Sequence, residues 1–561
     1  MDLQFDPDGH EPWAGIASGS GAVRAGASAL QRLAAVLAAH PGVMLGAVAL
    51  ALHLWANAGY DYFSDELYFI VCGQHLAWGY VDQPPLAPLI ARGAHELFGD
   101  SLLGLRLVPA LAAAGLAALS TEAARRLGGG LFARWLAGLA VLAAPVLCAD
   151  GLLLSADTLQ PLAWLAASLA LMAAIERQRT TTWLMLGAIA GAALLAKYVM
   201  AFFLVAAAIG LVATPQRRVL ARPGPWLAAA LALLIILPNL LWQQAHGWPF
   251  LQLNATAFNA RNITYDPLNY LLQQVLIVGP LNAPIWLAGL AGFAFWPRLA
   301  AARWLAVAWI ALMALMLLIH GKSYYPAAIY PVLLAGGAVV VEAAVRGYGA
   351  RAAIASATIL GGAALLPFTL PILPVASFIA YEHALGVKTE HAAVDKQPVG
   401  ELPPNYAYMF GWREMAAAVG RAYQALPPQD RARAVFFARD YNEAAAVDVF
   451  GGPWRLPPAI SARNNYFLWG PRGHDGSVVL LLSTAPRPDL LKAYAEMEPA
   501  TRIGEVGAIR RELLRTYASA EPVARIDAAH AYPFERGLTL WLCRDRKIPF
   551  AADWSTLKLY F

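Results

Sequence analysis

Residues 105–147 read LRLVPALAAAGLAALSTEAARRLGGGLFARWLAGLAVLAAPVL, two long apolar runs that meet at a short basic loop. Arg125, Arg126 and Arg134 supply the positive charge of that loop. An apolar run of about 20 residues can cross the hydrocarbon core of a bilayer as a helix, and arginines in short loops mark the cytoplasmic side. The stretch therefore predicts a pair of membrane-spanning helices joined on the inner face.

The composition of the 561-residue chain agrees with many such spans. Hydrophobic residues make up 59% of it and charged residues 14%, whereas soluble globular chains have about 25% charged residues. The mean hydropathy is +0.51. A net charge of +5 does not indicate nucleic-acid binding, because the cations stand in short clusters between apolar runs. Three cysteines are too few and too scattered for a disulfide framework or a metal cluster.

Further apolar runs predict a polytopic α-helical protein with about eleven transmembrane helices between residues 42 and 380. The runs lie near 42–58, 102–121, 131–149, 158–175, 181–196, 198–214, 226–242, 271–295, 304–319, 326–342 and 352–380. Two of them meet at Lys197 with almost no loop, either as a tight hairpin or as one long tilted helix. The charge distribution favours the hairpin. Residues 1–41 are acidic and Gly/Ser-rich and are expected to form a flexible cytoplasmic tail, with a short surface helix over Leu30 to His40.

Alternation of the spans divides the loops into two chemically different sets. One side receives most of the arginines and is cytoplasmic by the positive-inside rule. The other side receives few cations and a concentration of Asp, Glu, Tyr and Trp. Any site is therefore expected on the outer face.

Residues 381–561 are more polar and are expected to form an extracytoplasmic α/β domain, because an odd number of spans places them outside. Its expected elements are strands over Ala434 to Ala438, Ser477 to Ser483 and Gly537 to Cys543, and a helix over Asp489 to Met497.

The first outer loop, residues 59–101, carries the first candidate site residues. Asp65 and Glu66 precede a moderately amphipathic segment, Glu66 to Trp78, suited to an interfacial helix. An ionisable pair at the mouth of a span is a functional hypothesis. The alternative is that Ser64 or Asp65 caps the helix and Glu66 lies in its first turn.

Asp82 follows in the segment Tyr80-Val81-Asp82-Gln83-Pro84-Pro85, whose prolines predict an extended entry into a second helix through Arg92, His95 and Glu96. A plain loop-to-helix turn is the alternative. Asp82 has a weaker capping explanation than Asp65 has.

The order of several motifs resembles bacterial glycosyltransferase family 39, which includes protein O-mannosyltransferases and aminoarabinose transferases acting on lipid A. The motifs are Asp65-Glu66, Asp82-Gln83-Pro84-Pro85, Gly104-Leu105-Arg106-Leu107, Ser155-Ala156-Asp157, Lys197-Tyr198 and Gly321-Lys322-Ser323-Tyr324-Tyr325-Pro326. Later segments, Tyr441 to Asp448 and Asn464 to Pro471, are similar to the external domain of one bacterial branch. Each motif is weakly specific, but their shared order covers about 400 residues.

The resemblance implies a GT-C fold and transfer of a hexosyl or pentosyl group from a polyprenyl-phosphate donor. It implies Asp65 as general base, with Glu66 positioning the acceptor or Asp65, and inversion at the anomeric centre. It further implies these binding roles: donor phosphate at Lys197, Tyr198, Arg106, Lys322 and Tyr325, and substrate at Asp82, Asp157 and Tyr324. A divalent metal ion held by acids such as Asp82 and Asp157 is left open.

Simpler readings compete with some of these roles. Lys197 and Lys322 would also suit interfacial cations, and Tyr324 and Tyr325 fit an aromatic belt. At the level of the whole chain, a transporter or flippase of lipid-linked sugars is the alternative, although such a protein should carry ionisable groups at mid-span. The acceptor is left open between lipid A, another envelope lipid, a glycan and a protein hydroxyl. The expected location is the bacterial cytoplasmic membrane, with the C-terminal domain in the periplasm.

Overall fold

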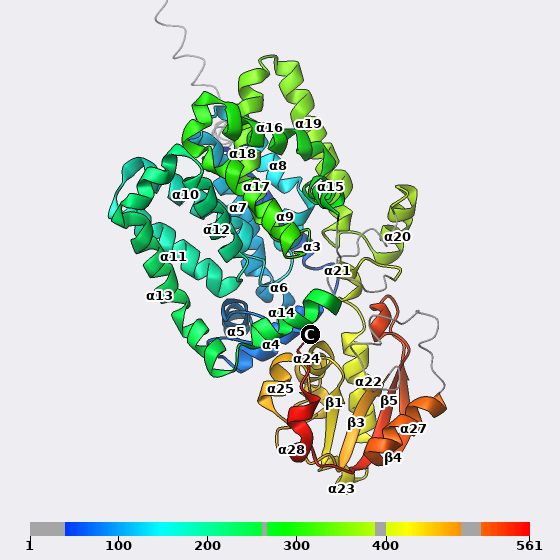
Figure 1. Ribbon diagram of the computed structural model, residues 1–561. Helices are drawn as coiled ribbons and strands as arrows, with labels where there is room; N and C mark the ends of the chain where they lie inside the picture. Colours follow the sequence, from blue (N-terminus) through cyan, green and yellow to red (C-terminus); the bar gives the residue numbers. More distant parts are fainter. Residues whose placement is uncertain (1–39, 261–265, 388–399, 484–505, 561) are drawn as a thin grey trace, which may run out of the picture.

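The computed structural model describes residues 40–260, 266–387, 400–483 and 506–560. A bundle of helices occupies one end of the molecule and a domain built on a β-sheet occupies the other (Figure 1). The predicted N-terminal tail and the helix expected over Asp489 to Met497 lie outside the described residues.

The helical end extends from residue 41 to residue 384. Its α-helices are α3 Pro41–Ala56, α4 Ser64–Gln74, α5 Leu86–Phe98, α6 Leu102–Leu105, α7 Leu107–Arg126, α8 Leu131–Leu142, α9 Pro145–Asp150, α10 Gln160–Arg177, α11 Thr180–Ala196, α12 Met200–Val212, α13 Pro223–Ala245, α14 Pro249–Ala260, α15 Pro267–Val278, α16 Ala283–Phe295, α17 Trp304–Leu318, α18 Tyr330–Ala344, α19 Tyr348–Leu365 and α20 Val375–Ala384. The 3₁₀ helices between them are η1 Pro215–Ala221, η2 Pro280–Asn282, η3 Pro297–Ala302, η4 Tyr325–Ile329 and η5 Leu366–Phe368.

Four helical stretches of the described residues are long and apolar enough to cross a membrane, and two bent helix pairs raise the number to six if each pair is one span. The four are Leu102–Arg126, Pro223–Ala245, Tyr325–Ala344 and Tyr348–Phe368. Four shorter apolar helices accompany them. The expected count of about eleven is therefore not confirmed, because several apolar runs are shorter or broken. The run 131–149, for example, ends as α8 at Leu142 and restarts at Pro145.

The chain breaks at Lys197. Helix α11 ends at Ala196, Lys197 has an extended backbone with φ −158° and ψ 140°, and α12 begins at Met200. The reading of one long helix through Lys197 is therefore wrong, and two separate helices meet there, as the hairpin reading predicted.

Helices α4 and α5 lie between the bundle and the sheet domain (Figure 1). They match the two helices expected in the first outer loop. The prolines at 84 and 85 stand directly before α5, where their fixed φ suits a helix entry.

The C-terminal domain is a five-stranded mixed sheet with helices packed on it. The strand order is β2-β1-β3-β5-β4, with β1 parallel to β2 and β3 and the other neighbours antiparallel. The strands are β1 Ala434–Ala438, β2 Ile460–Ser461, β3 Val478–Ser483, β4 Tyr517–Ile526 and β5 Leu538–Arg546. The other elements are α21 Pro404–Ala407, α22 Trp412–Gln424, α23 Pro428–Arg431, α24 Tyr441–Phe450, η7 Gly452–Trp454, α25 Asn464–Trp469, α27 Val506–Thr516, η9 Pro533–Glu535, α28 Phe550–Asp553 and η10 Trp554–Leu557. The predicted α/β domain and its three predicted strands are confirmed.

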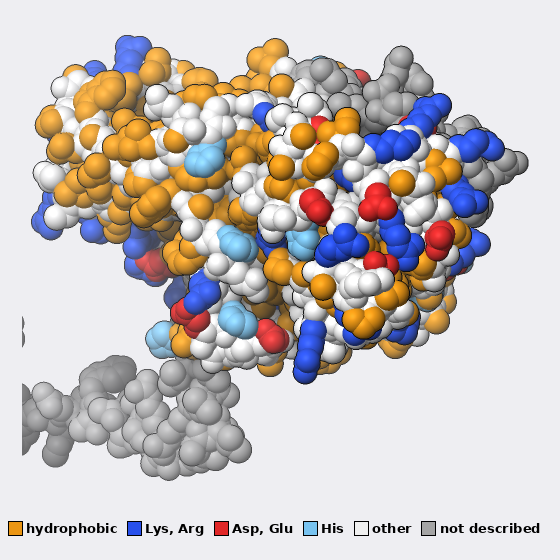
Figure 2. Space-filling view, turned by 90° about the horizontal axis from the view of Figure 1, so that it is seen from below, with side chains coloured by type: hydrophobic (Ala, Val, Ile, Leu, Met, Phe, Trp, Pro, Cys, Tyr) orange, Lys and Arg blue, Asp and Glu red, His pale blue; other side chains and the backbone are white. Residues whose placement is uncertain are grey.

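One apolar core joins α4 and α5 to the sheet domain. Leu67 and Tyr68 of α4 are buried together with Ala445 of α24, Val419 of α22 and Phe436 of β1. Helices α4 and α5 thus share the core of the C-terminal domain instead of forming an independent layer. Seen from below, charged side chains gather over the sheet domain, whereas hydrophobic ones cover much of the bundle (Figure 2).

Candidate functional site

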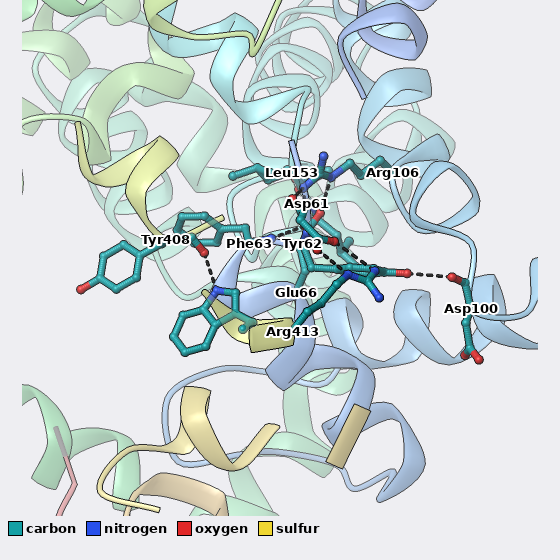
Figure 3. Close-up of polar contacts among 12 residues, drawn as sticks. Asp61, Tyr62, Phe63, Glu66, Asp100, Arg106, Leu153, Tyr408 and Arg413 are labelled. Atoms are coloured by element: carbon teal, nitrogen blue, oxygen red, sulfur yellow. Dashed lines mark hydrogen bonds and ion pairs between the residues drawn. The ribbon is translucent and has the colours of Figure 1, made fainter. Parts of the chain in front are cut away.

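Glu66 fixes the start of α4 and ties it to the bundle. The helix has Phe63 as N-cap, and the Phe63 N–H donates to Glu66 Oε2 at 2.9 Å. Asp65 therefore lies in the first turn, where the helix dipole favours an acid, and the expected cap at Ser64 or Asp65 is wrong by a residue or two. Arg106 donates from Nε to Glu66 Oε1 at 2.9 Å and from Nη2 to Oε2 at 2.7 Å (Figure 3).

The side chains of this ion pair are both 0% exposed. The Arg106 Nη2 also donates to the Asp61 carbonyl, and the Leu154 N–H donates to Glu66 Oε1. A buried bidentate pair of this kind holds its elements in one geometry, and removal of one partner leaves a buried unpaired charge. Glu66 and Arg106 therefore position α4. Among the described residues, Nη1 of Arg106 meets no hydrogen-bond partner, so a donor phosphate would have to approach that nitrogen.

Asp82 lies close to Asp65, and the two form an acid pair at the first outer loop. The Tyr68 hydroxyl donates to Asp82 Oδ1 at 3.3 Å and the Asn464 amide donates to Oδ2 at 3.1 Å. Burial raises the pKa of Asp82 to about 7, and the negative charge of Asp65 acts in the same direction. A carboxyl group with this pKa can exchange a proton near neutral pH.

Asn464 and Asn465 bring the C-terminal domain to this acid pair. The Val81 N–H donates to Asn465 Oδ1 at 2.7 Å, and the Asn465 N–H lies 3.3 Å from the Tyr68 hydroxyl. Asn464 has a left-handed backbone, φ +44°, which asparagine tolerates better than most residues. The motif at Asn464 was noted in the sequence, but its contact with Asp82 had no local signal.

Lys197 is the centre of a second group, the lysine cluster of Lys197, Asp157, Tyr324 and Tyr325. Its Nζ lies 2.5 Å from Asp157 Oδ2, 5.0 Å from the centre of the Tyr325 ring and 5.7 Å from that of Tyr324. Both charged side chains are 21% exposed. Asp150, which sequence reasoning did not select, interacts electrostatically with Asp157 and Lys197. Its signal was its place at the end of an apolar run.

Lys322 reaches the edge of the lysine cluster. Its Nζ lies 6.0 Å from the centre of the Tyr324 ring. The backbone around it is held from α15, because the Tyr270 hydroxyl donates to the Lys322 carbonyl and the Gln274 amide donates to the Ser323 carbonyl. Both lysines therefore approach the ring of Tyr324.

Two connections link the acid pair to the lysine cluster. Leu154, bonded to Glu66, stands three residues before Asp157 in the same loop. Tyr198, next to Lys197, donates to Asn239 Oδ1 at 2.7 Å.

Asn239 then connects to the first outer loop. Its amide donates to the Trp78 carbonyl, and Gln243 one turn later donates to the Tyr80 carbonyl. A Cβ on Gly79 would lie 2.8 Å from Asn239 Nδ2, so only glycine permits this approach. The predicted residues thus converge on one region from α4, the 78–83 loop, the 150–158 loop, the α11–α12 break and the turn before η4.

Gln83 adds an unassigned polar group beside Asp82. Its side chain is 3% exposed, and neither amide atom meets a hydrogen-bond partner among the described residues. A buried amide without partners costs about 1–3 kcal/mol, so a substrate group or a water molecule is expected there.

The described residues contain no group of three or more His, Cys, Asp or Glu side chains arranged to hold a metal ion. Asp82 and Asp157, the acids considered for a divalent ion, already bond to Tyr68 and Asn464 and to Lys197, respectively.

Comparisons with known proteins agree with this arrangement. The model of the dolichyl-phosphate-mannose-protein mannosyltransferase family matches residues 82–242. Lipid A galacturonosyltransferase RgtD of Rhizobium johnstonii is 26% identical over 231 residues, which are 39% of this chain and 47% of that protein. The match therefore spans about half of the curated relative.

Solved structures of ArnT from Cupriavidus metallidurans share the fold over most of the chain. The structure bound to undecaprenyl phosphate has a TM-score of 0.54 at 17% identity, covering 89% of this chain and 97% of that one. The apo structure has a TM-score of 0.53 at 16% identity, with the same coverage. The sequence comparisons and this shared architecture confirm the resemblance to glycosyltransferase family 39 and its GT-C fold.

Proposed function

We propose that this protein is a membrane glycosyltransferase that moves a sugar from a polyprenyl-phosphate donor to a lipid acceptor at the outer face of the bacterial cytoplasmic membrane. The C-terminal domain would then lie in the periplasm. The ArnT structure with undecaprenyl phosphate supports the donor class, and the lipid A transferase relative makes lipid A the first acceptor to test.

The observation that carries the proposal is the placement of Lys197. It stands at a break between two apolar helices, over two tyrosine rings, paired with Asp157 and within the electrostatic influence of Asp150. An ammonium group at a membrane edge suits the phosphate of a lipid carrier. Asp157 and a donor phosphate would both accept hydrogen bonds from the Lys197 ammonium group. The ammonium group can donate three hydrogen bonds, so we expect it to bind the phosphate without losing Asp157 altogether.

The reaction would place the acceptor hydroxyl against the anomeric carbon, on the face opposite the phosphate. Asp65 takes the hydroxyl proton, the acceptor oxygen forms the new glycosidic bond, and the bond between the anomeric carbon and the phosphate oxygen breaks. The released polyprenyl phosphate keeps the bonding electrons and is stabilised by Lys197, with Lys322 nearby. Asp82 adjusts the charge around Asp65, and attack from the opposite face inverts the anomeric centre.

The first test reconstitutes the full chain in liposomes with a radiolabelled polyprenyl-phosphate sugar and lipid A. Wild type should transfer label, and Asp65→Asn should lower the rate by about 100-fold or more, as expected for loss of a general base. Asp100→Asn is the matched control, because Asp100 is an exposed acid of the same outer loop.

Undiminished transfer by Asp65→Asn would remove Asp65 as the base. Asp82→Asn tests the other member of the acid pair, and a loss confined to that variant would assign the base to Asp82. Label that crosses the bilayer on its intact carrier, with no transfer, would instead support a flippase.

A further inference from the structure

A cavity of about 520 Å³ lies between the C-terminal end of α4 and the sheet domain, outside the site described above. Gln74 and His75 line it from α4 and its cap, and Asp448 of α24, Trp469 of α25 and Arg472 line it from the sheet domain. Asp65 and Gln74 are nine residues apart on one helix, which corresponds to about 14 Å. The cavity is thus near the acid pair but separate from it.

Aromatic rings form one wall of the cavity. The rings of His75 and Trp469 have centroids 4.6 Å apart with an interplanar angle of 36°. The Arg472 guanidinium lies 5.5 Å from the Trp469 ring centre and 5.6 Å from that of Tyr466. Trp469 is only partly buried, and the glycine at 470 has open space around it. Part of the Trp469 ring surface therefore borders the cavity next to polar groups.

A hydrogen-bond acceptor, Asp448, and a hydrogen-bond donor, Arg472, both line the cavity. Asp448 accepts from the Ala459 N–H at 2.6 Å and from the Tyr466 hydroxyl at 2.8 Å. Arg472 Nη1 lies 3.7 Å from Asp448 Oδ2, too far for a hydrogen bond. Arg472 Nη2 is buried and meets no hydrogen-bond partner among the described residues. The guanidinium thus has an unused N–H group, which can donate to a ligand oxygen once the Arg472 side chain turns toward the cavity.

The mixture of groups narrows the ligand class. One acid and one cation face each other, so the cavity has no strong net charge, and a free phosphate would be repelled by Asp448. A purely apolar ligand would leave Arg472 Nη2 without a hydrogen-bond partner. A sugar ring combines a carbon face for Trp469 with hydroxyl groups that both donate and accept.

We propose that this cavity binds a sugar of the acceptor's headgroup, with Trp469 against the ring face and Arg472, Asp448 and Gln74 at its hydroxyl groups. This inference rests on the proposed transferase function in one respect: that function makes the bound sugar part of the acceptor. The binding itself is independent of catalysis. It would let the periplasmic domain hold the acceptor while its reacting hydroxyl reaches the acid pair.

The test measures binding without a donor. The full chain in detergent is mixed with a β-1,6-linked glucosamine disaccharide, and saturation-transfer NMR reports contact with the sugar protons. Wild type should show transfer to the ring protons, and Trp469→Ala and Arg472→Gln should each weaken affinity roughly tenfold. Arg433→Gln is the control, because Arg433 is an exposed arginine of the same domain. Thermal unfolding verifies that each variant is folded, and Gln74→Ala serves as a milder second variant at an exposed position.

The outcomes separate the two proposals. Absent saturation transfer in wild type, equal transfer in both cavity variants, or displacement of the disaccharide by inorganic phosphate would overturn the sugar site. Binding that is lost in the variants while no acceptor is ever glycosylated would leave the sugar site standing and remove the transferase function. If transfer occurs, cavity variants should raise the acceptor KM and leave kcat unchanged, whereas an unchanged acceptor KM would contradict the inference.

Discussion

At the scale of single residues, the raised pKa of Asp82 could not be predicted from the sequence. Its sequence context, two residues before a pair of prolines, predicted a loop acid with a possible substrate role. Burial raises its pKa, the negative charge of Asp65 acts in the same direction, and hydrogen bonds from Tyr68 and Asn464 oppose the rise. Asn464, which helps to enclose Asp82, is 382 residues away in the chain. No local pattern records a contact of that separation.

The raised pKa of Asp82 predicts a pH-dependent stability. Between pH 3.8 and about 7 the folded protein keeps this carboxyl protonated while the unfolded chain has released the proton. The free energy of unfolding should therefore fall as pH rises through this range and remain lowered above pH 7, by on the order of 4 kcal/mol at most. Asp82→Asn removes the titration. Its thermal midpoint should exceed that of wild type by more at pH 8 than at pH 5, and an equal difference at both pH values would contradict the assignment.

A second prediction at this scale concerns Lys197. Lys197→Met should lower kcat/KM for the polyprenyl-phosphate donor roughly 10- to 100-fold, since a charge-assisted hydrogen bond to the phosphate is lost. Lys197→Arg should restore part of it. Lys558→Met, at a lysine bonded to Gln252 of α14, is the control in the same transfer assay.

The role of Lys197 could also be limited to neutralising Asp157. The double variant Lys197→Met, Asp157→Asn distinguishes the two roles, because it removes the unpaired acid along with the cation. Recovery of full activity in the double variant would show that Lys197 serves only its acid partner.

At the scale of elements, local patterns predicted more than long-range contacts. Strands β1, β3 and β5 and helices α4 and α5 follow from short apolar or amphipathic segments. Strand β4 was not predicted, because Pro522 interrupts it at a register shift and its burial pattern does not alternate regularly, with half of its residues exposed. Strand β2 has only two residues, Ile460 and Ser461.

The site could be predicted as a set of residue types on one face, but not as pairs. Arg106 was expected at a phosphate and Glu66 near the acceptor, whereas the structure joins the two as an ion pair. Burial decides this arrangement, since two fully desolvated opposite charges must meet each other or other polar partners. The charges of Glu66 and Arg106 can be read from the sequence, but the distance between their side chains cannot.

This ion pair gives a prediction about how α4 is attached to α7. Arg106→Met should lower the free energy of unfolding by about 3–5 kcal/mol, because Glu66 is left buried without its cation. Adding Glu66→Gln should recover a large part of the loss. Arg125→Met is the matched control, because Arg125 makes an exposed pair with Glu122. Thermal unfolding in detergent measures all four proteins, and equal losses for Arg106→Met and Arg125→Met would contradict the positioning role.

At the scale of the whole molecule, the sheet domain completes the site instead of merely lying beside it. Its Asn464 bonds Asp82, its Asn465 bonds the Val81 N–H, and its helix α24 covers α4. Arg413 also donates to both carboxylate oxygens of Asp61 at the start of the first outer loop (Figure 3).

Removal of the sheet domain should therefore abolish transfer. A chain ending at residue 387 would expose the apolar face of α4, including Leu67 and Val71, which are buried against that domain. We expect aggregation or loss of a cooperative thermal transition, with no glycosyl transfer. Size-exclusion chromatography in detergent and the transfer assay check this. A monodisperse, active truncated chain would show that the domain is dispensable.

The contact between Asn465 and Tyr68 has a consequence for how the protein is made. The two residues are 397 positions apart. A ribosome must therefore synthesise most of the chain after α4 before the part of the sheet domain that buries α4 emerges. During that interval α4 has an unmatched apolar face at the water–lipid boundary, where it can rest on the bilayer surface. The surroundings of Asp65 and Asp82 are thereby incomplete until translation nears its end, and a prematurely terminated chain would lack the residues of the sheet domain that contact Asp82.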